Sequence, residues 1–214
     1  MIYEIFRIFG TVTGYPAQLL FFKRKTYYEG GKRRRAFKGG KLVISNHYNV
    51  LDYVMSCFVV FPRKLHAVTS EAPFKSKLVT FLMRFWGCIK CDRETRSMRF
   101  MDVAADVLKN GKLVQIFPEG HNTPDGKIHE FKHSYLVIAH RSGAPIVPVV
   151  TDGNYGVFKR THVIIGKEID VSPFFDPERR TPTREELKTA NEYVYNKVLA
   201  LREELENKKQ RRTQ

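Results

Sequence analysis

Short apolar runs alternate along this chain with longer segments whose apolar residues recur every three or four positions. The runs have the length of buried strands and cover residues 41–46, 65–69, 88–91, 113–117, 145–150 and 162–165. The longer segments have helical periodicity and cover residues 51–61, 73–86, 98–108 and 134–141. A further helix begins at Arg184, where Thr183 and Glu186 have the spacing of a capping box. This alternation predicts an α/β fold with a mostly parallel central sheet flanked by helices on both faces.

The N-terminal segment is first apolar and then strongly basic. Residues 8–22 carry no charge, but these 15 residues are fewer than the roughly 20 that a spanning helix needs, and Pro16 interrupts them. Residues 1–41 hold ten Lys and Arg against two Glu, a net charge of +8 out of +15 for the chain. We expect an N-terminal interfacial helical segment on an anionic membrane surface, at the cytoplasmic face, in a peripheral or monotopic protein. The alternative is a helix that packs into the core.

These features divide the chain into three expected parts and exclude several classes of protein. The parts are a membrane-interface helical segment with a basic patch over 1–38, a main domain over 39–207 and a frayed basic tail over 208–214. A composition with 43% hydrophobic and 28% charged residues excludes a mainly disordered chain, and three cysteines exclude a disulfide scaffold. No helix-turn-helix, zinc-finger or RNP-like pattern accompanies the positive charge, so we expect no nucleic-acid partner.

The first loop with potentially reactive side chains, the first loaded loop, follows the predicted strand at 41–46. It contains His47 and Asp52. If His47 stands at the strand end and Asp52 in the first turns of the next helix, the carboxylate can reach back to a ring nitrogen. Such a contact orients the imidazole and raises its basicity, which is what a general base needs. The ordinary reading of the same pair is a partly exposed histidine with a nearby carboxylate.

The second loaded loop, Pro118-Glu119-Gly120-His121-Asn122-Thr123, follows the predicted strand at 113–117. It has two interpretations. It can be a tight turn that exposes an acid, as is usual for Pro-x-Gly. It can also be a place where the backbone at Gly120 approaches a ligand closely while Glu119 binds hydroxyl groups.

Both loops together form an ordered pair of motifs, His-x4-Asp and then Phe-Pro-Glu-Gly that begins 70 residues after the histidine. This pair resembles the lysophospholipid and glycerophosphate acyltransferase family, and most closely its 1-acylglycerol-3-phosphate branch. The resemblance covers roughly residues 40–170 and makes 39–207 an acyltransferase domain. It continues at 87–93, which ends in Asp92-Arg93, at Phe131-Lys132 and at Ile146-Val147-Pro148-Val149.

The resemblance implies a mechanism and a set of site residues. His47 would take the proton from the free hydroxyl of a lysophospholipid as that oxygen attacks the thioester of acyl-CoA or acyl-carrier-protein. Asp52 would hold His47, the product from 1-acylglycerol-3-phosphate would be phosphatidic acid, and neither a metal nor a further cofactor is expected. The substrate-binding residues would be Asn46, Arg93, Glu119, Gly120, His121, Asn122 and Lys132.

One departure from the family pattern concerns the acceptor. The family commonly continues Phe-Pro-Glu-Gly with Thr-Arg-Ser, whereas this chain has His121-Asn122-Thr123. Either the acceptor phosphate is held by Arg93, Arg96, Lys127 or Lys132, or the acceptor is another hydroxyl compound, such as a different lysolipid or an amino-acid lipid. The alternative from a different class is a non-catalytic basic module that binds membranes or other polyanions.

Overall fold

One twisted sheet lies at the centre of the molecule in a computed structural model that describes residues 9, 12–14, 16, 22–33, 35–49, 51–70, 76–91, 98–123 and 125–211. Within these residues, seven strands form the sheet in the order β1-β7-β6-β2-β5-β3-β4, and each neighbouring pair is parallel except β6 and β7. The strands are β1 (Lys25–Tyr28), β2 (Lys41–Ser45), β3 (Leu65–Ser70), β4 (Ile89–Cys91), β5 (Leu113–Ile116), β6 (Ile146–Thr151) and β7 (His162–Ile165).

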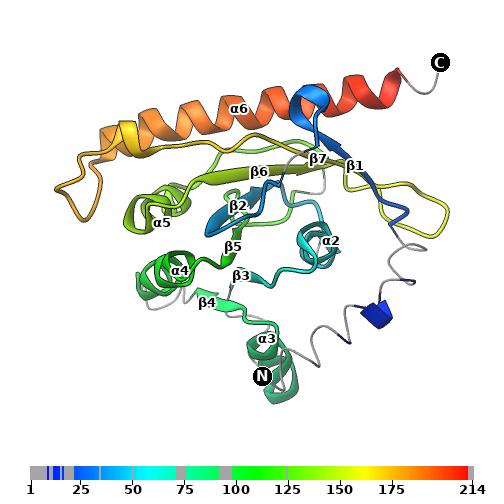
Figure 1. The fold of residues 1–214 in the computed structure, drawn as a ribbon, viewed down its shortest axis with the longest axis horizontal. Helices are drawn as coiled ribbons and strands as arrows, with labels where there is room; N and C mark the ends of the chain where they lie inside the picture. Colours follow the sequence, from blue (N-terminus) through cyan, green and yellow to red (C-terminus); the bar gives the residue numbers. More distant parts are fainter. Residues whose placement is uncertain are drawn as a thin grey trace.

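Helices cover both faces of this sheet (Figure 1). They are α2 (Leu51–Val60), α3 (Lys77–Phe85), α4 (Arg99–Lys109), α5 (Ser134–Ser142) and α6 (Arg184–Gln210), with short 3-10 turns η1 (Glu29–Gly31) and η3 (Ser172–Phe174). Alternate residues of a strand point to opposite faces, so Leu42 and Ile44 pack in the cluster formed with α4, α5 and α6, whereas Val43 packs in the cluster with α2. The predicted α/β fold with a mostly parallel sheet and helices on both faces is confirmed.

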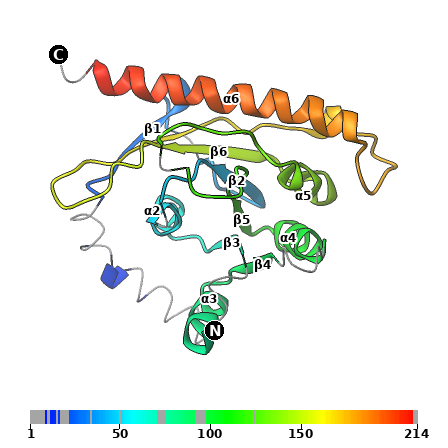
Figure 2. The same cartoon turned by 180° about the vertical axis from the view of Figure 1, so that it is seen from behind.

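The predicted strands and helices agree closely with those observed. The strand at His162–Ile165 and the start of the last helix at Arg184 match to the residue, and both bonds of the capping box between Thr183 and Glu186 are present. Figure 2 shows α6 running along the sheet, where it packs on β6 and β7. Five buried apolar residues line this contact side at helical spacing: Ala190, Val194, Val198, Leu201 and Leu205.

The boundaries of the expected parts differ from the structure at two places. Strand β1 falls inside the segment 1–38 and pairs with β7, so the sheet begins before the expected boundary. Its residues Lys-Thr-Tyr-Tyr lie at the sheet edge and are only partly buried. They therefore lack the apolar run by which the other strands were predicted. Helix α6 continues through Gln210, beyond the expected start of the tail at 208, because Lys208 and Lys209 form ion pairs with Glu204 and Glu206 along it.

The expected interfacial helical segment lies mostly outside the described residues. Among the residues that are described, no helix is both long and apolar enough to cross a membrane.

The sheet topology places the two loaded loops beside each other. Strands β2 and β5 are parallel neighbours, with Leu42 opposite Val114 and Ile44 opposite Ile116. The carboxyl ends of parallel strands lie at the same edge of a sheet, where the following loops form the usual ligand site of open α/β folds. The loops after Ser45 and after Ile116 therefore meet at one edge.

Candidate active site

His47 and Asp52 contact each other at the carboxyl end of β2. The imidazole Nδ1 lies 3.1 Å from Asp52 Oδ2. Asp52 is the second residue of α2, and its Oδ2 also accepts the backbone N–H groups of Tyr48 and Asn49, both at 2.7 Å. The carboxylate is 1% exposed, so these protein donors, rather than water, fix its orientation. The reach-back from helix to strand end that the sequence suggested is present in the structure.

The backbone of His47 is also held on both sides of its peptide unit. Its N–H donates to Glu119 Oε1 at 3.0 Å, and its carbonyl accepts the N–H of Thr123 at 2.7 Å and the hydroxyl of the same threonine at 3.1 Å. The ring stacks on Phe117, with centroids 4.0 Å apart and an interplanar angle of 18°. The side chain is 18% exposed, and Nε2 is the ring nitrogen that does not face Asp52.

Asn46 and Glu119, both expected to bind substrate, direct their polar atoms into the protein. Asn46 is fully buried, and its side-chain amide exchanges two hydrogen bonds of 3.0 Å with the backbone of Thr151 on β6. Glu119 is 1% exposed, and its Oε2 accepts the Thr123 hydroxyl and the His129 N–H, both at 3.0 Å. The contacts shown for these two side chains support the loop that carries His47.

Gly120, His121 and Asn122 lie in the turn after β5, and Lys132 lies against this turn. Gly120 has a φ of 75°, and a Cβ at this position would stand 2.9 Å from Lys132 Nζ. The lysine side chain therefore lies across the glycine, with its ammonium group over the turn that follows β5. His121 and Asn122 are exposed. Of the other cations considered for a phosphate, Lys127 is exposed, and Arg93 and Arg96 lie outside the described residues.

Comparison with known proteins identifies the family. A family model described as Acyltransferase matches residues 25–152, which include both loops. This chain belongs to the acyltransferase family.

Relatives of this acyltransferase from distant organisms are named 1-acyl-sn-glycerol-3-phosphate acyltransferases. The chain is 24% identical over 174 residues to the 1-acyl-sn-glycerol-3-phosphate acyltransferase of Bacillus subtilis, across 79% of this chain and 82% of that protein. It is 29% identical over 113 residues to the human 1-acyl-sn-glycerol-3-phosphate acyltransferase beta, across 51% of this chain and only 40% of that protein.

A solved structure shows the same fold. The crystal structure of the 1-acyl-sn-glycerophosphate acyltransferase PlsC from Thermotoga maritima has a TM-score of 0.58 and 23% sequence identity, across 85% of this chain and 73% of that chain.

Two residues at the site of this acyltransferase were missed by the sequence analysis. Tyr155 donates its hydroxyl hydrogen to Asp52 Oδ1. Arg202 of α6 donates to the Thr151 carbonyl at 2.9 Å and stands 5.7 Å from the ring centroid of Tyr48. For Tyr155 a signal existed, since Gly153-Asn154-Tyr155-Gly156 directly follows the predicted strand at 145–150, and that strand ends at the same edge of the sheet as β2. For Arg202 we find no local signal.

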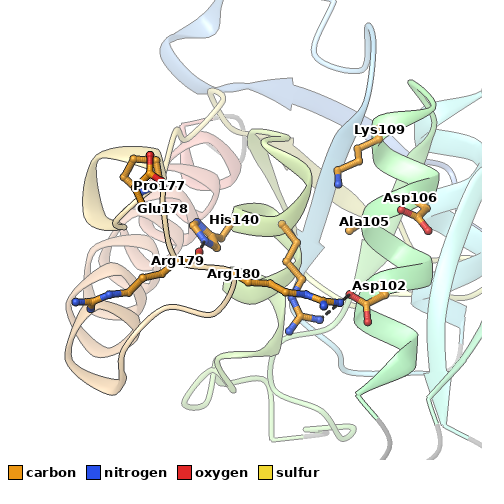
Figure 3. Close-up of a pocket in the computed structure, with 10 residues that line it drawn as sticks. Asp102, Ala105, Asp106, Lys109, His140, Pro177, Glu178, Arg179 and Arg180 are labelled. Carbon is orange, nitrogen blue, oxygen red and sulfur yellow. Dashed lines mark hydrogen bonds and ion pairs between the residues drawn. The ribbon is translucent and has the colours of Figure 1, made fainter.

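A cavity of about 670 Å³ lies elsewhere, between α4, α5 and the segment 177–180 (Figure 3). Charges of both signs line it, and they pair with each other: Asp102 Oδ1 lies 2.8 Å from Arg141 and 3.4 Å from Arg180. None of the lining residues belongs to the loops of His47 and Glu119, so we assign this cavity no part in acyl transfer.

Proposed function

We propose that this acyltransferase moves a fatty acyl group from an acyl thioester, acyl-CoA or acyl-carrier-protein, to the free hydroxyl of a lysophospholipid. The observation that carries the proposal is the contact between Nδ1 of His47 and the buried carboxylate of Asp52. The names of the relatives make 1-acylglycerol-3-phosphate the first acceptor to test.

The proposed chemistry follows from this contact. Nε2 of His47 takes the proton of the acceptor hydroxyl while the hydroxyl oxygen attacks the thioester carbonyl. The tetrahedral intermediate then collapses, the carbon–sulfur bond breaks, and the leaving thiolate receives the proton from the imidazolium. Asp52 stabilises the imidazolium between these steps and keeps the proton-bearing Nδ1 turned toward itself. The ester and the free thiol are the products, and the enzyme returns to its starting state.

The proposed acceptor site lies over the turn after β5. Lys132 places its ammonium group there, across Gly120, and an ammonium is a suitable partner for a phosphate. Arg93 is the second cation that the family resemblance assigns to the acceptor. Asn122 stands where the family commonly has arginine, which favours one alternative: an acceptor hydroxyl on a lysolipid with a different headgroup.

We also propose that the enzyme works at the cytoplasmic face of an anionic membrane and docks through residues 1–24, which precede the first strand of the sheet. A second exposed feature lies at the same end of the sheet as His47, on the loop between β6 and β7. Phe158 is 95% exposed on this loop, is followed by Lys159 and Arg160, and has Lys23 Nζ at 6.0 Å from its ring centroid. An exposed aromatic ring among cations suits the interface of an anionic bilayer.

The deciding experiment is identification of the lipid product. Purified enzyme is incubated with labelled acyl-CoA or acyl-carrier-protein and a panel of lysolipids, and the products are identified by mass spectrometry. His47→Ala is expected to lower the turnover by about 10²–10⁴-fold while the circular dichroism spectrum is unchanged. His140→Ala on α5 is the matched control. Full activity of His47→Ala would refute the mechanism, and salt-sensitive polyanion binding without any acylated product would favour the non-catalytic module.

A further inference from the structure

The loop between β6 and β7 carries a side chain, Tyr155, that contacts Asp52 of the proposed catalytic pair His47 and Asp52. Figure 1 shows this loop, in yellow, extending beside the start of β1. Within it the hydroxyl of Tyr155 donates to Oδ1 of Asp52, the oxygen that does not face His47. The ring packs edge-on against Phe22, with centroids 5.3 Å apart, and the hydroxyl lies 3.4 Å from the Thr151 hydroxyl. Tyr155 is thus held in place by contacts from two other segments.

The tyrosine can act only as a donor to this carboxylate. Burial raises the pKa of Tyr155, and the neighbouring charge of Asp52 raises it further, so the hydroxyl keeps its proton at every pH at which the enzyme works. Since Asp52 is 1% exposed, water cannot replace this donor. The two carboxylate oxygens therefore have separate partners: Oδ1 accepts from Tyr155, and Oδ2 faces Nδ1 of His47 and two backbone N–H groups.

We propose that Tyr155 is a positioning residue for acyl transfer, which holds the carboxylate of Asp52 so that Oδ2 stays directed at Nδ1 of His47. The proposal rests on the proposed function, because it assigns a role within the same catalytic pair. A carboxylate without a donor on Oδ1 can turn about its Cβ–Cγ bond and is less favoured in its charged form. Both changes weaken the stabilisation of the imidazolium.

The groups that face Asp52 come from several segments of the chain. His47 and Tyr48 face it from the loop after β2, and Tyr155 faces it from the loop after β6. From α2 itself, Ser56 donates to the backbone carbonyl of Asp52 rather than to its side chain. Two further carboxylates lie in this region: Glu119, which like Asp52 is near Tyr48, and Asp152, which like Asp52 is near Tyr155.

The test is the pH profile of acyl transfer by Tyr155→Phe, measured as kcat and KM for the acceptor from about pH 5 to about pH 9. We expect kcat to fall about tenfold near neutral pH and the acceptor KM to change less than about twofold. The acidic limb of kcat, which reports loss of the proton from His47, should move to lower pH by about one unit, because the imidazolium is less stabilised. In an Asp52→Asn background the substitution should cost little more, because the two residues act as one unit. Tyr135→Phe is the control, since it removes the hydroxyl of another buried tyrosine outside the site. That hydroxyl donates to Asn191 Oδ1 at 2.9 Å.

A second variant serves if Tyr155→Phe does not fold. Site-specific 3-fluorotyrosine at 155 keeps the shape and makes the hydroxyl a stronger donor, so the acidic limb should move to higher pH, opposite to the shift in Tyr155→Phe. An unmoved limb in a folded variant, or a loss that adds fully to that of Asp52→Asn, overturns the proposal. Failure of the proposed function is distinguishable from this, because then the wild-type enzyme itself forms no acylated lipid.

Discussion

Glu119 accepts a hydrogen bond from the backbone N–H of His47 at 3.0 Å, and this contact joins two loops that are 72 residues apart in the sequence. Thr123, four residues after Glu119, closes the same connection by donating to the His47 carbonyl. Glu119 and Thr123 of the second motif thus hold the backbone of His47 in the first motif. The histidine is held through its backbone by one motif and through its ring by Asp52.

Replacing Glu119 should therefore reduce stability and turnover together. Glu119→Ala leaves the part-buried N–H groups of His47 and His129 without this acceptor, and we expect it to lower the free energy of unfolding by about 1–3 kcal/mol. Urea denaturation and acyl-transfer kinetics measure the two effects, with Glu130→Gln, an exposed carboxylate on the same loop, as the control. An unchanged unfolding free energy with a raised acceptor KM would instead mean that Glu119 binds the acceptor directly.

Lys132 is expected to select acceptors by their charge. Removing its ammonium in Lys132→Gln should raise the KM for a lysolipid with an anionic headgroup by about tenfold, the equivalent of one charged hydrogen bond, with little change in kcat. The KM for a lysolipid without net charge should stay the same. Kinetics on this pair of acceptors, with Lys109→Gln on α4 as the control, measure the difference. Equal effects on both acceptors would argue that the lysine only shapes the turn.

Phe158 is expected to contribute to membrane binding. Phe158→Ser removes an aromatic ring that would enter the bilayer interface, and we expect vesicle affinity to fall about tenfold, in line with the transfer free energy of one such side chain. Flotation with vesicles that contain anionic lipid, compared with neutral vesicles, measures this, and Leu199→Ser on the exposed side of α6 is the control. If both variants bind alike, docking belongs to other parts of the basic surface.

His162 should make the fold less stable in weak acid. Burial lowers the pKa of this imidazole below its ordinary value of 6.5, and the Tyr27 hydroxyl lies 3.0 Å from its Nδ1. As the pH falls through that value, the unfolded chain binds a proton that the folded protein does not, so the free energy of unfolding decreases. Denaturation of wild type and His162→Asn at about pH 7.5 and about pH 5.5 tests this. The variant should lose less stability on acidification, and an equal loss would contradict the assignment.

Much of the fold follows from periodicity that can be read locally. The strand at 162–165 is a run of apolar residues next to a turn, and the helix from Arg184 has both a capping box and an apolar side at helical spacing. Strand β1 was missed because Lys25-Thr26-Tyr27-Tyr28 has little apolar character of its own. It is a strand because its backbone hydrogen-bonds to β7, and pairing of this kind is not visible in the sequence of either segment.

The sequence by itself determined which residue types stand at the carboxyl ends of β2 and β5, and with them His47 and Asp52, because their spacing lets a helix residue reach back to a strand end. Only the tertiary structure decided which side chains face inward. Asn46 and Glu119 bond within the protein, and Tyr155 and Arg202 come to the site from segments more than 100 residues away in the chain. The physical reason is that a hydrogen bond depends on proximity in space, which the pairing of β2 with β5 and β6 creates and which spacing along the chain does not encode.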